Sequence, residues 1–248
     1  MQTKDPSRSY VLAHGSWHGG WCWRPVADQL RKAGHQVFTP SFTGMGDRAH
    51  LLNESITLDT FIDDLVQLIL AEELQDVILV GHSFAGVPIS GVADRIPERL
   101  AHLVYFDAVV LEDGQHSFSN YPPEEAENRI AAAGRSTGGL AVPVPDPLPP
   151  AWGLSPDMPE YEWIKRRLTA HPARTYTSPI HLQNPLGNGV PKTYIHCRNP
   201  ELGLLESSRQ LVRQQAEWHW LDVDAGHEAH ITHPNLIANI LLEKILVK

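Results

Sequence analysis

The stretch Asp76-Val77-Ile78-Leu79-Val80-Gly81-His82-Ser83-Phe84-Ala85-Gly86 decides the expected fold. Its four consecutive apolar residues predict a buried strand, which ends where a glycine allows a tight turn. A serine follows two positions after that glycine, and an amphipathic segment begins directly behind it. This order of strand, turn, serine and helix is typical of a nucleophile elbow, in which a serine side chain is presented at the end of a parallel strand.

The turn around Ser83 is crowded, so it requires small residues two places before and two places after the serine, and Gly81 and Ala85 meet that requirement. The usual pattern has glycine where Ala85 stands, and here Gly86 follows one place later. A buried strand that simply ends in a Gly-Ser turn is the alternative interpretation of this short motif. The choice between the two depends on the rest of the chain.

Length and composition restrict the class of protein. The chain has 248 residues, enough for one large α/β domain with its own core. Its formal net charge of −9 argues against nucleic acid or an anionic membrane as the partner. The polar N-terminus lacks the apolar run of a signal peptide, and no segment is apolar enough for a membrane span. The two cysteines, Cys22 and Cys197, suggest no disulfide framework, so we expect a soluble cytoplasmic protein.

Strand-like and helix-like segments alternate along most of the chain. Strands are expected at 9–13, 36–39, 77–80, 100–106, 193–197 and 218–223, and helices at 25–32, 58–70, 83–95, 204–214 and 236–246. This alternation predicts an α/β fold with a mostly parallel sheet of about six strands and helices on both faces. In such a fold, the active site lies at the carboxyl ends of the strands.

The segment 111–189 differs from the rest. It holds most of the chain's 20 prolines, and such a tract resists both helix and inner strand. Short helical pieces are expected only around 124–133 and 161–168. We therefore predict that 111–189 is a cap inserted into a core made of 1–110 and 190–248, within one domain.

A serine becomes a nucleophile only when a base accepts its proton and a third group orients that base. His227 follows the last expected strand directly and is the predicted base. A histidine taken at random from the chain's 14 would more often be structural. His230 and His233 extend a spacing of three residues that could suggest a metal, but the form His-Glu-x-x-His is missing, so we predict neither a metal nor a cofactor.

The acid that orients the base has two candidates. Asp107 follows the strand after the elbow strand, and the ends of neighbouring strands place their side chains close together. Its alternative role is to cap the following turn. Glu201 is the second choice, because it lies in the turn after the penultimate expected strand.

Acyl transfer also requires N–H donors for the developing oxyanion. We predict the backbone N–H groups of Ser16 and Phe84, since Gly15 lets the backbone of the first loop approach closely. Tryptophans and histidines in such loops are more often core residues, but several here lie in or near the loops at the strand ends. The predicted pocket residues are Gly15, Trp17, His18 and Trp152.

Three motifs together carry a resemblance to a known family. They are His14-Gly15-Ser16-Trp17-His18-Gly19-Gly20-Trp21, Gly81-His82-Ser83-Phe84-Ala85-Gly86 and Gly226-His227. With them the chain resembles the α/β-hydrolase superfamily, and more narrowly the branch that contains plant methylesterases, hydroxynitrile lyases, and bacterial esterases and carbamate-cleaving hydrolases. The resemblance implies Ser83 as nucleophile, His227 as base, and Ser16 and Phe84 as oxyanion donors.

Departures from the branch separate its activities. Hydroxynitrile lyases carry threonine at the position of Gly15 and lysine directly after the catalytic histidine, where this chain has Glu228. The resemblance therefore argues against a cyanohydrin lyase. Plant members have an aspartate at the position of Pro200, whereas bacterial relatives with the element Tyr105-Phe106-Asp107-Ala108 fit this chain better.

We therefore expect a serine hydrolase that cleaves small to medium, apolar or aromatic carboxylic esters through an acyl-enzyme on Ser83. Carbamates and activated amides are close variants of such substrates. The alternative is a cofactor-free lyase or oxygenase on the same fold, in which His227 is the base and Ser83 only positions the substrate. A small-molecule receptor is a third class, against which an intact triad argues. The expected partner is a small-molecule ester, and the choice between monomer and homodimer stays open.

Overall fold

A six-stranded sheet forms the centre of the computed structural model, which describes residues 7–245. The strands are β1 (Ser9–Ala13), β2 (Gln36–Phe38), β3 (Val77–His82), β4 (Leu100–Phe106), β7 (Lys192–Cys197) and β8 (Trp218–Val223). They lie in the order β2-β1-β3-β4-β7-β8, and each neighbouring pair is parallel. The predicted parallel sheet is confirmed, and β3, the elbow strand, lies near its middle.

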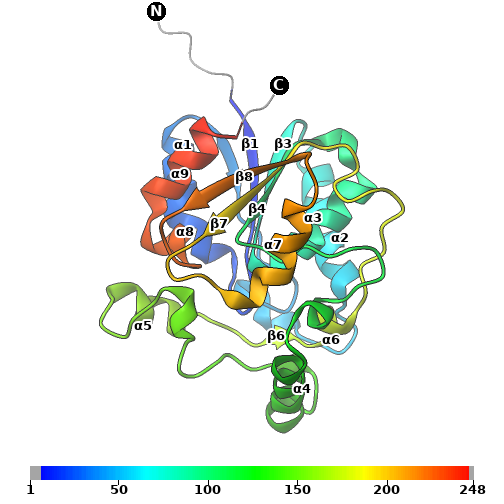
Figure 1. The fold of residues 1–248 in the computed structure, drawn as a ribbon, viewed down its shortest axis with the longest axis vertical. Helices are drawn as coiled ribbons and strands as arrows, with labels where there is room; N and C mark the ends of the chain where they lie inside the picture. Colours follow the sequence, from blue (N-terminus) through cyan, green and yellow to red (C-terminus); the bar gives the residue numbers. More distant parts are fainter. Residues whose placement is uncertain (1–6, 246–248) are drawn as a thin grey trace, which may run out of the picture.

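Helices cover both faces of the sheet, as predicted (Figure 1). On one face lie α1 (Arg24–Lys32), α8 (Ala229–Thr232) and α9 (Pro234–Glu243), and on the other lie α2 (Leu58–Ala71), α3 (Gly86–Arg95) and α7 (Glu206–Arg213). Short 3-10 turns occupy Gly20–Trp23, Gly46–Leu51, Ser83–Ala85, Pro97–Arg99, Ser117–Asn120, Pro150–Trp152 and Gly203–Leu205. The helix expected from residue 83 therefore begins as a 3-10 turn and becomes an α-helix only at Gly86.

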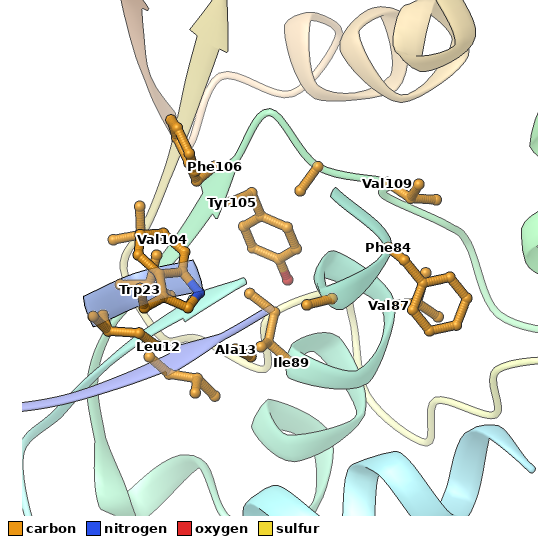
Figure 2. Close-up of a cluster of buried hydrophobic side chains, with 14 of the residues drawn as sticks. Leu12, Ala13, Trp23, Phe84, Val87, Ile89, Val104, Tyr105, Phe106 and Val109 are labelled. Carbon is orange, nitrogen blue, oxygen red and sulfur yellow. The ribbon is translucent and has the colours of Figure 1, made fainter. Parts of the chain in front are cut away.

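The core is built from alternate side chains of the central strands, which point to opposite faces of the sheet (Figure 2). Phe106 packs against Trp23, with ring centroids 5.8 Å apart. Tyr105, the preceding residue, points toward α3, where its hydroxyl lies 2.9 Å from Ser90 Oγ. All of these residues are fully buried. This packing fixes the end of β4, and with it the position of the residue that follows.

The cap segment 111–189 contributes no described strand to the central sheet. It contains α4 (Pro123–Thr137), α5 (Pro159–Lys165), α6 (Arg174–Thr177) and a small antiparallel pair, β5 (Ala141–Val142) and β6 (His171–Pro172). Figure 1 shows α4, α5 and β6 beyond the carboxyl ends of the central strands. The boundaries at 111 and 189, and the view of the whole chain as one domain, stay predictions.

Within residues 7–245, no helix has the length and apolar character needed to cross a membrane. The start of the chain, residues 1–6, lies outside the described residues, so the expected absence of a signal peptide stays a prediction. The same holds for the last residue of the expected helix 236–246, and the described α9 ends at Glu243.

Gly86, one place after the position where the usual elbow pattern has glycine, stands where no side chain fits. A Cβ atom there would lie 2.2 Å from the carbonyl oxygen of Val109 and 2.9 Å from the Cβ of Ala108. A Cβ atom at Gly81 would lie 2.7 Å from the carbonyl oxygen of Ala85. The close approach of the strand end, the turn and the segment after β4 therefore requires both glycines.

Replacing Gly86 by alanine should lower the free energy of unfolding by about 1–3 kcal/mol, because the added methyl group meets backbone that cannot move freely. Urea unfolding measures the change. Gly134→Ala is the matched control: this glycine lies inside α4 with no atom within 4 Å of an added Cβ, so alanine should leave stability unchanged or raise it slightly. Equal stabilities for Gly86→Ala and the wild type would contradict the steric argument.

Candidate active site

Ser83 lies directly after β3 with a backbone φ of 55°, in the left-handed region that residues with a side chain rarely adopt. Its carbonyl oxygen accepts a hydrogen bond from the N–H of Val109, with an N–O distance of 2.8 Å. Strained backbone of this kind persists where the surrounding structure holds it, and it is common at functional sites. The strained turn presents the Ser83 side chain at the carboxyl end of the sheet.

Ser83, His227 and Asp107 form a continuous chain of contacts across the ends of three strands. His227 Nε2 lies 3.0 Å from Ser83 Oγ, and His227 Nδ1 lies 2.6 Å from Asp107 Oδ2. Because the Asp107 carboxylate accepts a hydrogen bond from Nδ1–H, the neutral imidazole has no proton on Nε2, which is free to accept the serine proton. The three residues that the sequence singled out for nucleophile, base and acid thus lie together.

Asp107 is completely buried and also has a left-handed φ of 41°. Besides the contact with His227, its other carboxylate oxygen accepts a hydrogen bond from the N–H of Cys197 at 3.3 Å. Glu201 belongs to a different network: its Oε1 lies 2.9 Å from His196 Nε2 and 3.2 Å from Arg209 Nη2. The geometry therefore favours Asp107 over Glu201 as the partner of His227.

His82, the residue before Ser83, holds the loop of the histidine in place. Its Nε2–H donates to the carbonyl oxygen of His227 at 3.0 Å. Burial, with the nearby His230, lowers the pKa of His82 well below its usual range, so the imidazole stays neutral. No motif in the sequence points to this role, which follows from the juxtaposition of β3 with the loop after β8.

The cap contacts the loop that contains Ser16, the predicted oxyanion donor. Tyr176 donates its hydroxyl proton to Ser16 Oγ at 2.6 Å, and Trp17 Nε1 donates to the carbonyl oxygen of Val142 at 3.2 Å. The N–H of Thr169 donates to the carbonyl oxygen of Trp17 at 2.8 Å. Gly15 lies against the nucleophile, since a Cβ atom at Gly15 would be 2.8 Å from the Cβ of Ser83.

The cap also contacts the loop that contains His227. The N–H of Glu228 donates to the carbonyl oxygen of Trp152 at 3.1 Å. A Cβ atom at Gly226 would lie only 2.8 Å from the Cα of Gly153, so the two backbones touch. The cap therefore contacts both the loop of Ser16 and the loop of His227.

A small cavity lies between the cap and these loops. It is lined by Ser83 and His227 and by the predicted pocket residues Gly15, Trp17, His18 and Trp152. Phe84, the second predicted oxyanion donor, follows Ser83 in the 3-10 turn, and its ring is buried against Tyr176 with centroids 5.1 Å apart. The donor roles of the Ser16 and Phe84 N–H groups stay predictions.

Two cap residues that the sequence analysis missed also line the cavity, Tyr121 and Arg129. The Arg129 guanidinium lies 5.0 Å from the ring centroid of Trp17 and 4.7 Å from that of Tyr121, and its Nε donates to Glu125 at 2.7 Å. No local feature of the sequence marks these two residues. The other site residues were predicted because they follow strands of the central sheet, and the cap has no such strands.

His82, His227 and Glu228 bring ligand atoms within 4.8 Å of one another, a spacing that a metal ion could bridge. However, His227 Nε2 faces Ser83 Oγ, and Glu228 Oε2 lies 3.4 Å from His18 Nε2. A metal ion bound there would take the imidazole away from the serine. The ligand atoms of this cluster therefore already contact Ser83 and His18, and the expected absence of a metal stays a prediction.

Comparisons with known proteins agree with this geometry. A family model described as "Alpha/beta hydrolase family" matches residues 10–240. The chain is 39% identical over 241 residues to a carbendazim hydrolyzing esterase of Nocardioides sp., which covers 94% of this chain and 98% of that protein. It is 24% identical over 250 residues to methylesterase 9 of Arabidopsis thaliana, covering 95% and 97% of the two chains. An extracellular alpha/beta-hydrolase from a Paenibacillus species has the same fold, with a TM-score of 0.81 and 24% identity over 95% of this chain and 98% of that one.

Proposed function

Because the chain belongs to the alpha/beta hydrolase family, we propose that it is a carboxylic-ester hydrolase that acts through an acyl-enzyme on Ser83. The observation that carries the proposal is the contact chain from Asp107 through His227 to Ser83, with distances of 2.6 Å and 3.0 Å. Relatives named as esterases, among them the Nocardioides protein that covers nearly the whole chain, support the same class of reaction.

In the proposed acylation step, Ser83 Oγ attacks the carbonyl carbon of the ester while His227 Nε2 accepts the hydroxyl proton. The carbonyl oxygen becomes an oxyanion, which accepts hydrogen bonds from the N–H groups of Ser16 and Phe84. The intermediate then collapses: the bond to the alcohol oxygen breaks, and His227 gives its proton to the departing alcohol. Asp107 stabilises the imidazolium that exists between the two proton transfers.

Deacylation repeats the sequence with water. His227 Nε2 accepts a proton from the water as its oxygen attacks the acyl carbon, and the second tetrahedral intermediate releases Ser83 with that proton. The products are a carboxylic acid and the alcohol, so no cofactor is needed to balance the reaction.

The lining of the cavity favours substrates with an apolar group. The indole rings of Trp17 and Trp152, with centroids 5.7 Å apart, provide apolar walls beside Ser83. We propose small to medium esters with an apolar or aromatic group, and carbamates or activated amides as variants that the same nucleophile would attack.

The experiment that tests this proposal is covalent labelling with an alkyl fluorophosphonate. The reagent should transfer its phosphonyl group to Ser83 Oγ with loss of fluoride, and His227 should accept the serine proton. We expect one label per chain, on the peptide that contains Ser83, and parallel loss of p-nitrophenyl ester cleavage. The control variant Glu201→Gln should be labelled at the wild-type rate. Full ester cleavage by a protein that remains unlabelled, or labelled elsewhere, would contradict the proposal.

A further inference from the structure

A buried carboxylate lies beside the proposed nucleophile and has no role in the mechanism above. Glu228 directly follows His227, its side chain is 1% exposed, and it lines the same cavity as Ser83. Among the described residues, no donor makes a well-aligned hydrogen bond to either of its carboxylate oxygens. A buried carboxylate without a counter-charge is costly. Something close to Glu228 must therefore compensate its charge.

His18 is the residue that does so. Its Nε2 lies 3.4 Å from Glu228 Oε2, and its side chain is 2% exposed. The other ring nitrogen, Nδ1, lies 2.8 Å from the carbonyl oxygen of Ser16. Because that oxygen only accepts, Nδ1 carries a proton. A second proton at Nε2 makes the ring an imidazolium that faces the carboxylate on one side and the backbone of Ser16 on the other.

Each of the two groups stabilises the charged form of the other. Burial by itself lowers the pKa of His18, but the Glu228 carboxylate and the carbonyl oxygen of Ser16 together outweigh burial and raise it. Burial by itself raises the pKa of Glu228, but His18, with smaller contributions from His82 and His227, outweighs burial and lowers it to about 2. His230, whose Nε2 lies 3.7 Å from Glu228, is not the counter-charge, because burial and His18 lower its pKa well below the usual range.

We propose that His18 and Glu228 are positioning residues for the proposed hydrolysis: their buried ion pair joins the loop of Ser16 to the loop of His227 and cancels the charge of the carboxylate near the developing oxyanion. An unpaired carboxylate in this cavity would repel the oxyanion, since charges interact strongly where water is excluded. The ion pair has no net charge and contacts the backbone carbonyl of Ser16, the residue whose N–H is the proposed donor. This inference rests on the proposed function.

A double-mutant cycle in kcat/KM for p-nitrophenyl esters tests the pair. His18→Gln leaves the carboxylate unpaired and should reduce kcat/KM roughly 10- to 100-fold. The double variant His18→Gln/Glu228→Gln removes the harmful charge as well, so it should recover about tenfold relative to His18→Gln. Two substitutions whose effects simply multiply would overturn the proposal.

The pH profile separates charge from shape. Without His18, burial should raise the pKa of Glu228, so the carboxylate becomes neutral as the pH falls and stops repelling the oxyanion. His18→Gln should therefore have its optimum at lower pH than the wild type, and the double variant should return to the wild-type optimum. The other titratable groups that face Glu228 are His82, His227, His230, Cys22 and Cys197. They are present in all four proteins, and an unshifted optimum in His18→Gln would count against the proposal.

A second histidine–glutamate pair provides the matched control. His196 Nε2 lies 2.9 Å from Glu201 Oε1, and neither residue lines the cavity. In the corresponding cycle with His196→Gln and Glu201→Gln, the two substitutions should affect kcat/KM independently of each other. The pH optimum of kcat/KM should stay at its wild-type value. If the effects of these two substitutions on kcat/KM were coupled as strongly as those at His18 and Glu228, the cycle would report general stability. That result would overturn the assignment of His18 and Glu228 to the oxyanion site.

A measurement on the wild type needs no enzymatic activity. In ¹⁵N–¹H spectra of the histidine side chains, His18 should carry protons on both ring nitrogens at pH 6 and lose the second proton at a higher pH than an exposed histidine. A His18 that is neutral at pH 6 would overturn the ion pair. If the wild type cleaves no ester, the proposed function fails, whereas these spectra still decide the charge state of His18.

Discussion

Ser83→Ala should reduce kcat/KM for p-nitrophenyl esters by about 10⁴- to 10⁶-fold, because it removes the atom that would form the acyl-enzyme. The wild type should release a burst of nitrophenol equal to the enzyme concentration, because nitrophenol leaves in the acylation step and water then removes the acyl group more slowly. The variant should show no burst. The fold should survive the change, because removing one hydroxyl leaves the strained turn and its contact with Val109 intact.

Ser90→Ala is the matched control for this result. Ser90 also offers a hydroxyl on the segment after β3, but its Oγ is buried and bonded to the carbonyl oxygen of Gly86 at 2.8 Å. The Ser90→Ala variant should therefore retain the burst of nitrophenol. Equal turnover by Ser83→Ala and the wild type would remove Ser83 from the chemistry. The alternative of a cofactor-free lyase or oxygenase with His227 as base would then become the better hypothesis.

Asp107→Asn should reduce kcat/KM by about 10³- to 10⁴-fold while leaving substrate binding nearly unchanged. The two side chains have almost the same size, so the buried site stays filled. The amide NH₂ of asparagine, however, donates a hydrogen bond to Nδ1, which then holds no proton. The proton moves to Nε2, and that nitrogen is no longer able to accept the proton of Ser83 Oγ.

Glu201→Gln measured beside Asp107→Asn decides between the two candidate acids. Its carboxylate is bonded to His196 and Arg209, so its neutral replacement should keep kcat/KM within a few-fold of the wild type. Steady-state kinetics and denaturation curves for both variants complete the test. If Glu201→Gln lowered kcat/KM more than Asp107→Asn, Glu201 rather than Asp107 would be the acid that orients His227.

The strand ends were the part of the site that the sequence could predict. Ser83, Asp107 and His227 each follow a strand, and the matching family confirms the resemblance that their motifs suggested. The positions of strands are readable because apolar runs and the glycines that end them are local features. The sequence also marked Gly86 as displaced from the usual pattern, but only the approach of Val109 to within 2.2 Å of an added Cβ shows what the glycine is for.

The choice between Asp107 and Glu201 shows where sequence reasoning reached its limit. Both residues follow a strand. Asp107 was favoured because it follows the strand after the elbow strand, and the ends of neighbouring strands lie close together, but this argument did not exclude Glu201. The structure separates them, because one carboxylate lies 2.6 Å from His227 and the other pairs with His196 and Arg209.

By itself, the sequence determined the parallel sheet, the order of its strands along the chain, and which residues stand at the strand ends, because these depend on periodicity and turn residues within a few positions. Only the tertiary structure decided how the cap closes the site and which charges are paired. Tyr176 reaches Ser16 across 160 positions, and Glu228 meets His18 from the opposite end of the chain. Such contacts leave no local pattern in the sequence. The proline-rich cap has no regular hydrophobic periodicity, and tertiary packing determines which residue lies next to a buried charge.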